Sequence, residues 1–329
     1  MNANPVDAFP ELKPILREIE HERTQMVHQF AQTTLWSVVI GGLLSLGLAL
    51  FQAGAWAFAP LVIALIVIGS TYASKASVWR SAFKQRFIAH LVKYVNPNLD
   101  YQPHGYISEH EYELSMLFHN SPNPDRYSGE DFIEGVVDKT DIRLSELHTQ
   151  YREVTYDSKG NRQERWVTIF RGLFISADFH KHFQGITLVL PDTEQSWLGG
   201  LGQWLQSLSA KLGGQPGELV KMEDPEFERF FKVFATDPTE ARYILTPNMI
   251  RRIVDFRNKS GSSIRLSFVA SRVFIAIPTM HNHLEPPSLF APANKLLEPA
   301  MIAQYFHELH FALAVVDELN LNTRIWTKR

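Results

Sequence analysis

The amino-acid sequence predicts an α+β protein: an N-terminal two-helix transmembrane hairpin, then a cytoplasmic domain with a mainly antiparallel sheet and a long C-terminal helix. The hairpin is indicated by Thr24–Ser74, 51 consecutive residues without Asp, Glu, Lys or Arg. Segments rich in β-branched and aromatic residues lie on both sides of a helical region, and apolar residues recur at helical spacing near the end of the chain. We therefore expect an N-terminal cytoplasmic helix at 1–32, the hairpin at 33–74, a basic juxtamembrane helix at 75–99 and the α+β domain at 100–329.

The hairpin consists of two apolar runs, Leu35–Phe51 and Trp56–Tyr72, separated by the short break 52–55. Each run has 17 residues, and at 1.5 Å per residue each run with its apolar neighbours just spans a hydrocarbon core of roughly 30 Å. A cleavable signal peptide is the alternative for the first run, but its leader is long and contains acidic residues, whereas a signal has a short basic leader. Neither run contains Asp, Glu, Lys, Arg or His, which favours an anchor over a transport path.

The distribution of Lys and Arg predicts the orientation of the hairpin. The loop between the runs has no basic residue, and the flanks on both sides do, so both termini are expected in the cytoplasm. Residues 75–99 contain five basic residues and no acidic one: Lys75, Arg80, Lys84, Arg86 and Lys93. Such a segment is attracted to anionic lipids by about 1 kcal/mol per basic residue near the surface, so membrane lipids are predicted partners.

The first half of the remaining chain has the composition of β-strands. Strands are expected at Phe132–Asp138, Ile142–Tyr156, Arg165–Ile175 and Gly185–Leu190. The Gly- and Asn-containing segment 157–161 is typical of a hairpin turn.

Helices follow, and then a second pair of strands. Three helix starts are indicated by a capping side chain before a proline, at Asp224-Pro225, Asp237-Pro238 and Thr246-Pro247. Alternation at 264–278 predicts a second hairpin, and a long C-terminal helix is expected to have one apolar face, formed by Ile302, Tyr305, Phe306, Leu309, Leu313 and Val316.

Several short runs, in order along the chain, resemble a known family. They are Asp131–Gly135, Phe170–Phe174, Gly185–Asp192, Asp224–Glu228, Glu240–Pro247 and Leu319–Trp326, behind a two-helix hairpin. In these runs the sequence resembles the bacterial membrane-protein family catalogued as domain of unknown function 3137. The resemblance implies a bacterial inner-membrane (plasma-membrane) protein and a LemA-like membrane protein as a candidate partner. It implies no activity and no site residues.

Composition excludes several classes of chemistry. The chain has no cysteine, so disulfides, thiolate nucleophiles and cysteine metal sites are ruled out. A net charge of -3 argues against binding of nucleic acid through bulk electrostatics. No Walker loop or Gly-x-Ser-x-Gly elbow is present, and Gly199-Gly200-Leu201-Gly202 lacks the lysine and third glycine of a nucleotide loop. We therefore expect no cofactor.

Histidines are the remaining candidates for metal ligands. His180 and His182, and His281 and His283 with Glu285, have spacings that two metal ligands could use on a strand. His307 and His310 are three residues apart, not the four of the metalloprotease motif. Solvated or hydrogen-bonded histidines are the alternative explanation for all of these pairs.

One apolar stripe stands out after the first strands. Its residues fall within one arc of a helix, and the other positions are small and uncharged: Trp197, Leu198, Leu201, Trp204, Leu205, Leu208 and Leu212. The stripe could pack on its own domain, lie in the membrane interface or bind a protein partner. The sequence thus favours a membrane-anchored interaction module that binds a protein or lipid. The alternative is a metal-dependent hydrolase that uses the His/Glu candidates.

Overall fold

The computed structural model describes residues 5–51, 54–192, 217–319 and 321, and the side chains from residue 10 onwards. It divides into two compact units. The first, here the hairpin unit, comprises Met1–Val95 and Leu284–His307; the second, the sheet unit, comprises Asn96–His283 and Glu308–Arg329. The predicted α+β fold class is confirmed.

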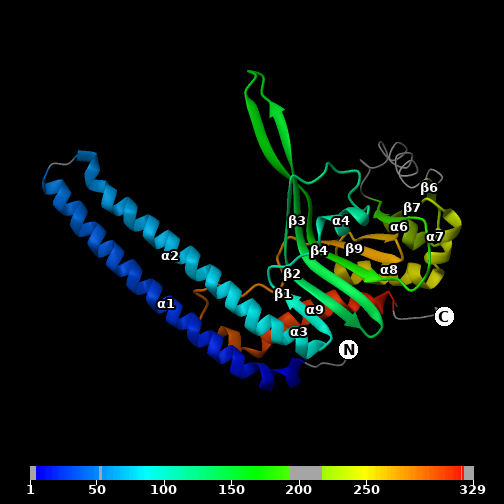
Figure 1. The fold of residues 1–329 in the computed structure, drawn as a ribbon, viewed down its shortest axis with the longest axis horizontal. Coiled ribbons are helices and arrows are strands. Elements are labelled where there is room, and N and C mark those ends of the chain that lie inside the picture. Colours follow the sequence, from blue (N-terminus) through cyan, green and yellow to red (C-terminus); the bar gives the residue numbers. More distant parts are fainter. Residues whose placement is uncertain (1–4, 52–53, 193–216, 320, 322–329) are drawn as a thin grey trace. The chain divides into compact units, whose positions relative to one another are not determined.

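The hairpin unit is built from two long helical segments that run side by side (Figure 1). Its elements are α1 (Pro5–Leu50), the 3₁₀ turn Gly54–Phe58, α2 (Ala59–Phe83), the π-helical turn Lys84–Ile88 and α3 (Ala89–Val95). Both segments are long and apolar enough to cross a membrane, and only 11% of the most apolar window of each is buried. The helix after the second run ends at Val95, directly before Asn96-Pro97, and β1 begins at Leu99, the last residue of the segment expected to be helical.

The return segment, residues 284–307, folds against the base of the two helices within the hairpin unit. Arg23 on α1 donates hydrogen bonds to the carbonyl oxygens of Leu289 and Ala291 at 2.7 and 2.8 Å. The Trp79 indole on α2 donates to the carbonyl oxygen of Pro287 at 2.9 Å. The base of the hairpin is therefore a folded core and not merely two apolar helices.

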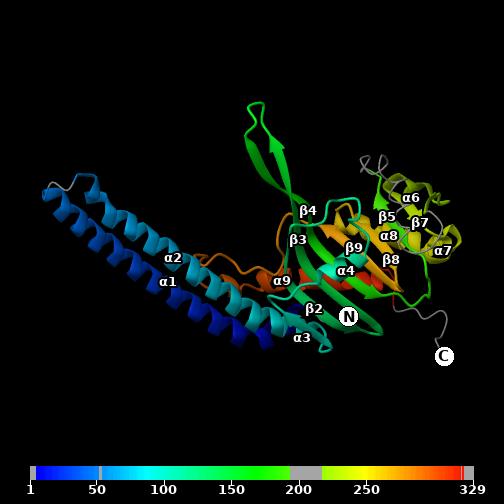
Figure 2. The ribbon, with the colours of Figure 1, turned by 45° about the horizontal axis from the view of Figure 1, so that its top comes forward.

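The sheet unit contains one nine-stranded antiparallel sheet in the order β1-β2-β3-β4-β9-β8-β5-β7-β6 (Figure 2). The strands are β1 (Leu99–Gln102), β2 (Arg126–Val137), β3 (Thr140–Tyr156), β4 (Arg162–Asp178), β5 (Thr187–Pro191), β6 (Glu218–Val220), β7 (Phe231–Ala235), β8 (Arg265–Val269) and β9 (Arg272–Pro278). The helices are α4 (Glu109–Leu114), α6 (Pro225–Phe230), α7 (Pro238–Ile244), α8 (Pro247–Ser260) and α9 (Pro299–Glu318), whose first half belongs to the hairpin unit.

The three predicted helix caps are confirmed. Asp224 and Asp237 accept hydrogen bonds from backbone amides of the first turns of α6 and α7, and Thr246 accepts from Met249 at the start of α8. Buried aromatic rings fill one face of the sheet; among them Tyr112 and Phe118 stack with centroids 4.9 Å apart. Burial raises the pKa of the Tyr112 phenol, so this ring stays neutral in the core.

Candidate functional site

A cavity of about 350 Å³ in the sheet unit, here the strand pocket, is lined mostly by polar side chains. It lies where β2, β3 and β4 run together, and the turn after β9 contributes its last residues. Its lining is His104, Ser128, Gly129, Glu130, Glu146, Leu147, His148, Arg171, Gly172, Thr279 and Asn282.

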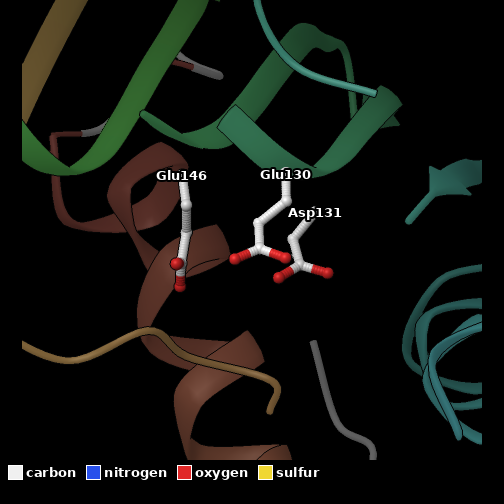
Figure 3. Close-up of side chains that lie close together, drawn as sticks. All are labelled: Glu130, Asp131 and Glu146. Atoms are coloured by element: carbon white, nitrogen blue, oxygen red, sulfur yellow. The ribbon is translucent and has the colours of Figure 1, made fainter. Parts of the chain in front are cut away.

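Strand register brings three carboxylates together beside this pocket. Glu130 on β2 pairs directly with Glu146 on β3, so their side chains lie on the same face. Asp131 follows Glu130, and in a regular strand it would point to the opposite face. The register of β2 shifts between Glu130 and Ile133, and Asp131 has a φ of 59°, which turns its side chain back. Figure 3 shows the three carboxylates lying close together.

Hydrogen bonds from the same unit hold each carboxylate. The Tyr101 phenol donates to Asp131 Oδ1, and the backbone N–H of His283 donates to Glu146 Oε1. The Asn282 amide donates to Glu130 Oε1 at 2.6 Å and itself accepts from Arg171 at 3.0 Å. The acidic cluster is therefore a fixed part of the fold, with Asp131 and Glu146 2% and 8% exposed.

The chemistry available to this cluster is that of an oxygen-only donor set. One ligand atom from each of Glu130, Asp131 and Glu146 lies within 4.8 Å of the others. Carboxylate oxygens suit Mg²⁺ or Ca²⁺ better than softer metals. Three oxygens are fewer than the roughly six to eight that these cations take, so water or a ligand would have to supply the others.

His148, which lines the strand pocket, has a shifted pKa. Its partial burial and the positive charge of Arg171 hold the pKa of His148 below its ordinary value. Its Nε2 lies 3.3 Å from Thr168 Oγ1. A neutral imidazole is therefore placed in the same cavity as Glu130 and Glu146.

The structure does not bring the two predicted histidine pairs together. His180 and His182 follow β4, which ends at Asp178, opposite Arg272. His281 and His283 follow β9, which ends at Pro278, opposite Gly172. The pairs thus lie at opposite ends of a ladder of seven residue pairs, whose six steps span about 20 Å at 3.4 Å per residue.

Each histidine pair contacts residues close to its own end of the ladder. His180 Nδ1 lies 3.2 Å from Asp178 Oδ2, and His182 is exposed. His283 touches the strand pocket through its backbone N–H, and burial lowers the pKa of its imidazole.

Glu285 belongs to the hairpin unit, where its carboxylate forms ion pairs with Arg80 of α2 and with Lys84 of the π-helical turn that follows. Its carboxylate lies 3.0 Å from Arg80 and 2.8 Å from Lys84, whose side chain is 1% exposed. A buried ammonium needs such a partner because an unpaired charge is costly in the core. Glu285 therefore neutralises the buried charge of Lys84 and the exposed charge of Arg80.

The basic juxtamembrane helix is also largely paired within the chain. Arg86 lies 2.7 Å from both Glu18 and Glu22 of α1, and the hydrogen bond to Glu22, followed by the charges of both carboxylates, raises the pKa of Arg86. Together with Arg80 and Lys84, three of its five basic residues have carboxylate partners.

The predicted apolar stripe lies outside the described residues. Its members, Trp197, Leu198, Leu201, Trp204, Leu205, Leu208 and Leu212, fall within 193–216. The prediction that the stripe packs on its domain, on a membrane or on a partner stays a prediction.

The acidic cluster was missed by reasoning from the sequence because its geometry depends on register. The available signal was Glu130-Asp131, two adjacent acids that interrupt the alternation of a strand before Phe132. Their partner Glu146 is fixed only by pairing between β2 and β3.

Comparison with known proteins gives a family match to part of the chain and no activity. Among proteins with curated descriptions, none matches the sequence. One solved structure, the "crystal structure of the mycobacterial trehalose monomycolate transport factor A, TtfA", is similar at 10% identity and a TM-score of 0.34, over 68% of this chain and 88% of that chain. A TM-score this low does not define a shared fold.

The family model "Protein of unknown function (DUF3137)" matches residues 168–321. The match begins within β4 and covers the rest of the described sheet unit and the return segment, and it confirms the resemblance seen in the short runs. Arg171 and Asn282 of the strand pocket lie inside it, whereas the three carboxylates precede it. Residues 168–321 of the chain are thus similar to the DUF3137 family of proteins of unknown function.

Proposed function

We propose that the chain is a membrane-anchored binding module of the bacterial inner membrane, with two membrane-spanning helices and both termini in the cytoplasm. Anchoring is supported by the exposed apolar surface of α1 and α2 and by the absence of charge between Thr24 and Ser74. The side chains of Phe51, Trp56 and Phe58 at the loop end are 87%, 77% and 66% exposed, as in an aromatic belt at a bilayer surface.

The observation that carries the binding role is a two-stranded arm, residues 151–156 of β3 and 162–167 of β4. Pairing with β2 ends at Gln150, and pairing with β9 reaches only Gly172. Between these points β3 and β4 pair with each other, and no other described strand joins them. The arm extends beyond the sheet in both views (Figures 1 and 2).

One face of the arm combines the apolar and aromatic side chains of Val154, Tyr156 and Trp166 with the paired charges of Arg152, Arg162 and Glu164. Val154, Tyr156 and Trp166 are 38%, 69% and 37% exposed. The pairs Arg152–Trp166 and Tyr156–Arg162 are separated by an even number of residues, so their side chains share this face. The Arg126 guanidinium lies 3.6 Å above the Trp166 ring.

An arm of this kind suits docking of a protein. A two-stranded ribbon buries little apolar surface by itself and is marginally stable alone. Its open edges offer unpaired backbone groups, and an added strand would satisfy them. Exposed aromatic residues beside arginine are the side chains most enriched in interface hot spots. We propose a protein partner, for which a LemA-like membrane protein is one candidate.

Photo-crosslinking in living cells tests this role. A photoreactive benzoylphenylalanine at Tyr156 is expected to form a discrete adduct, and the same residue at Thr155 is the control because it lies on the opposite face of the same strand. Trp166→Glu in the Tyr156 background should reduce the adduct. Equal adducts at both positions, or none at Tyr156, would contradict the proposal.

Fusion reporters test the topology separately. A reporter after Gly54 is expected to behave as periplasmic and one after Arg329 as cytoplasmic, because the loop lacks basic residues and both flanks contain them. The reverse pattern would overturn the orientation.

A further inference from the structure

We propose that the groove between α1 and α2 binds one anionic phospholipid, with the phosphate at Lys75 and an acyl chain along the apolar part of the groove. This inference rests on the membrane insertion proposed above. The groove lies wholly within the hairpin unit and has a volume of about 740 Å³. Both helices line it, through Gln29, Gln32, Thr33, Trp36, Ser37, Ile40, Gly41, Leu44, Pro60, Ile63, Ala64, Val67 and Lys75.

The two ends of the groove differ in chemistry as the two ends of a phospholipid do. Gln29, Gln32 and Lys75 line one end, and the lining becomes apolar toward Leu44 and Ile63. The fifteen-residue step from Gln29 to Leu44 corresponds to about 22 Å of helix. That length exceeds half of a hydrocarbon core of about 30 Å, so an acyl chain of one leaflet can lie along it.

Lys75 supplies charge complementarity at the polar end. Its ammonium donates a hydrogen bond to Gln29 Oε1 at 2.7 Å, which connects the two helices at the mouth of the groove. Among the described residues it forms no ion pair, in contrast to Arg80, Lys84 and Arg86. The nearest acidic residue before it in the sequence is Glu22. A lipid phosphate would therefore meet a cation that the fold has not neutralised.

An aromatic cluster places Lys75 at the level of the headgroups. Phe30, Tyr72 and Phe290 contact one another with ring centroids 5.4 to 6.1 Å apart. Tyr72 is 43% exposed, Phe290 is 49% exposed, and Lys75 follows Tyr72 by one turn of α2. Tyrosine is enriched where the hydrocarbon core meets the headgroups, so the exposed Tyr72 ring marks the depth at which a phosphate lies.

The shape of the groove favours a lipid chain over another helix. A Cβ added at Gly41 would lie 3.1 Å from Ala64 Cβ, so α1 and α2 are in close approach there and bound the groove. A helix 10 Å in diameter fills on the order of 1,700 Å³ over 22 Å, so a partner helix could pack only across the mouth of the groove and not within it. A partner helix would also need an acidic side chain at the membrane edge to match Lys75, whereas an anionic lipid carries its charge there.

Native mass spectrometry of the purified full-length chain tests the site. The protein is released from detergent in the presence of equal amounts of phosphatidylglycerol and phosphatidylcholine. We expect one retained phosphatidylglycerol, in about fivefold excess over phosphatidylcholine, and loss of that preference in Lys75→Gln. Lys159→Gln, in the turn of the β3–β4 arm, is the matched control and should keep the preference.

Two further variants test the position of the acyl chain. Ile63→Trp and Ile40→Trp fill the groove from opposite helices and should each reduce the retained lipid. The proposal would be overturned if the wild type retained the two lipids equally or if Lys75→Gln kept the preference. It would also be overturned if either folded tryptophan variant retained lipid fully, or if a second copy of the chain were bound in place of lipid. Alkaline carbonate extraction separates this failure from failure of membrane insertion: a chain released from the membrane pellet refutes insertion, whereas a chain that stays there without lipid preference refutes only the groove.

Discussion

Replacement of Arg23 by Met tests whether one buried ion pair holds the return segment to α1. Arg23 is 3% exposed and binds both carboxylate oxygens of Glu20, at 2.9 and 2.7 Å. It also donates to three carbonyl oxygens of the return segment, at 2.7, 2.8 and 3.2 Å. Glu20 in turn accepts the backbone N–H of Asn294 at 2.7 Å. Removal of the guanidinium therefore leaves a buried carboxylate without its cation.

The cost follows from this burial. The side chains of Arg23 and Glu20 are 4% and 7% exposed, so water cannot replace the lost partner without local opening. Breaking such a buried pair from one side costs about 3–5 kcal/mol. At about 1.4 kcal/mol per factor of ten, local opening of the return segment should become between about 10² and 10⁴ times more frequent.

Hydrogen exchange of the full-length chain in nanodiscs measures this opening. Amides in 289–298 should exchange faster in Arg23→Met by that factor, up to the rate of unprotected amides. Arg17→Met is the matched control, because Arg17 lies on the same helix and is exposed. The double variant Glu20→Gln/Arg23→Met should recover part of the protection, since no unpaired charge is left. Unchanged exchange in Arg23→Met would refute the argument that this pair holds the segment.

Three further results are expected. Glu285→Gln should lower the free energy of unfolding by about 3 kcal/mol in detergent, because it removes the carboxylate that faces the buried Lys84 ammonium. The metal content should not change, and an unaltered melting temperature would contradict this role. The pKa values of His148 and His283 lie below 6.5, so the unfolded chain binds protons more readily and stability should fall as the pH is lowered through 6.5. His148→Gln and His283→Gln should each make the melting temperature less dependent on pH between 5 and 7.5, and identical pH profiles would refute this. Gly172→Ala should prevent correct pairing of β4 with β9, because φ is 150° there and the new Cβ would lie 2.1 Å from a backbone oxygen; a native circular dichroism spectrum and elution volume would refute it.

Sequence reasoning succeeded where the signal is local. The caps Asp224, Asp237 and Thr246 start their helices as predicted, because a capping oxygen and a following proline act within one turn. The turn after Tyr156 forms because Asp157 accepts hydrogen bonds from the backbone amides of Lys159 and Asn161, and the side-chain hydrogen bond from Asn161 contributes most to lowering its pKa. These features need no knowledge of distant residues.

Prediction stopped where residues far apart in the sequence meet. The Glu240 carboxylate, in the first turn of α7, accepts the backbone amides of Gln184 and Gly185 before β5, at 2.8 and 2.7 Å, and no local pattern indicates this contact. Strand β2 begins at Arg126, earlier than Phe132, because its polar first half is held by pairing with β3 and not by its own composition. The acidic cluster and the return segment could not be predicted for the same reason, because both depend on contacts between residues that are far apart in the sequence.

The basic juxtamembrane segment shows how the tertiary structure changes the meaning of a charge count. A net charge of +5 over 75–99 predicts diffuse attraction to anionic lipid, which salt screens over about 8 Å at physiological ionic strength. Ion pairs within the hairpin unit occupy Arg80, Lys84 and Arg86, and partners as buried as Lys84 are screened far less than exposed ones. These charges therefore stabilise the base of the hairpin and contribute less to surface attraction. If Lys75 is the cation left for lipid, lipid preference should be a property of one site and should resist added salt more than the binding of an unpaired basic helix would.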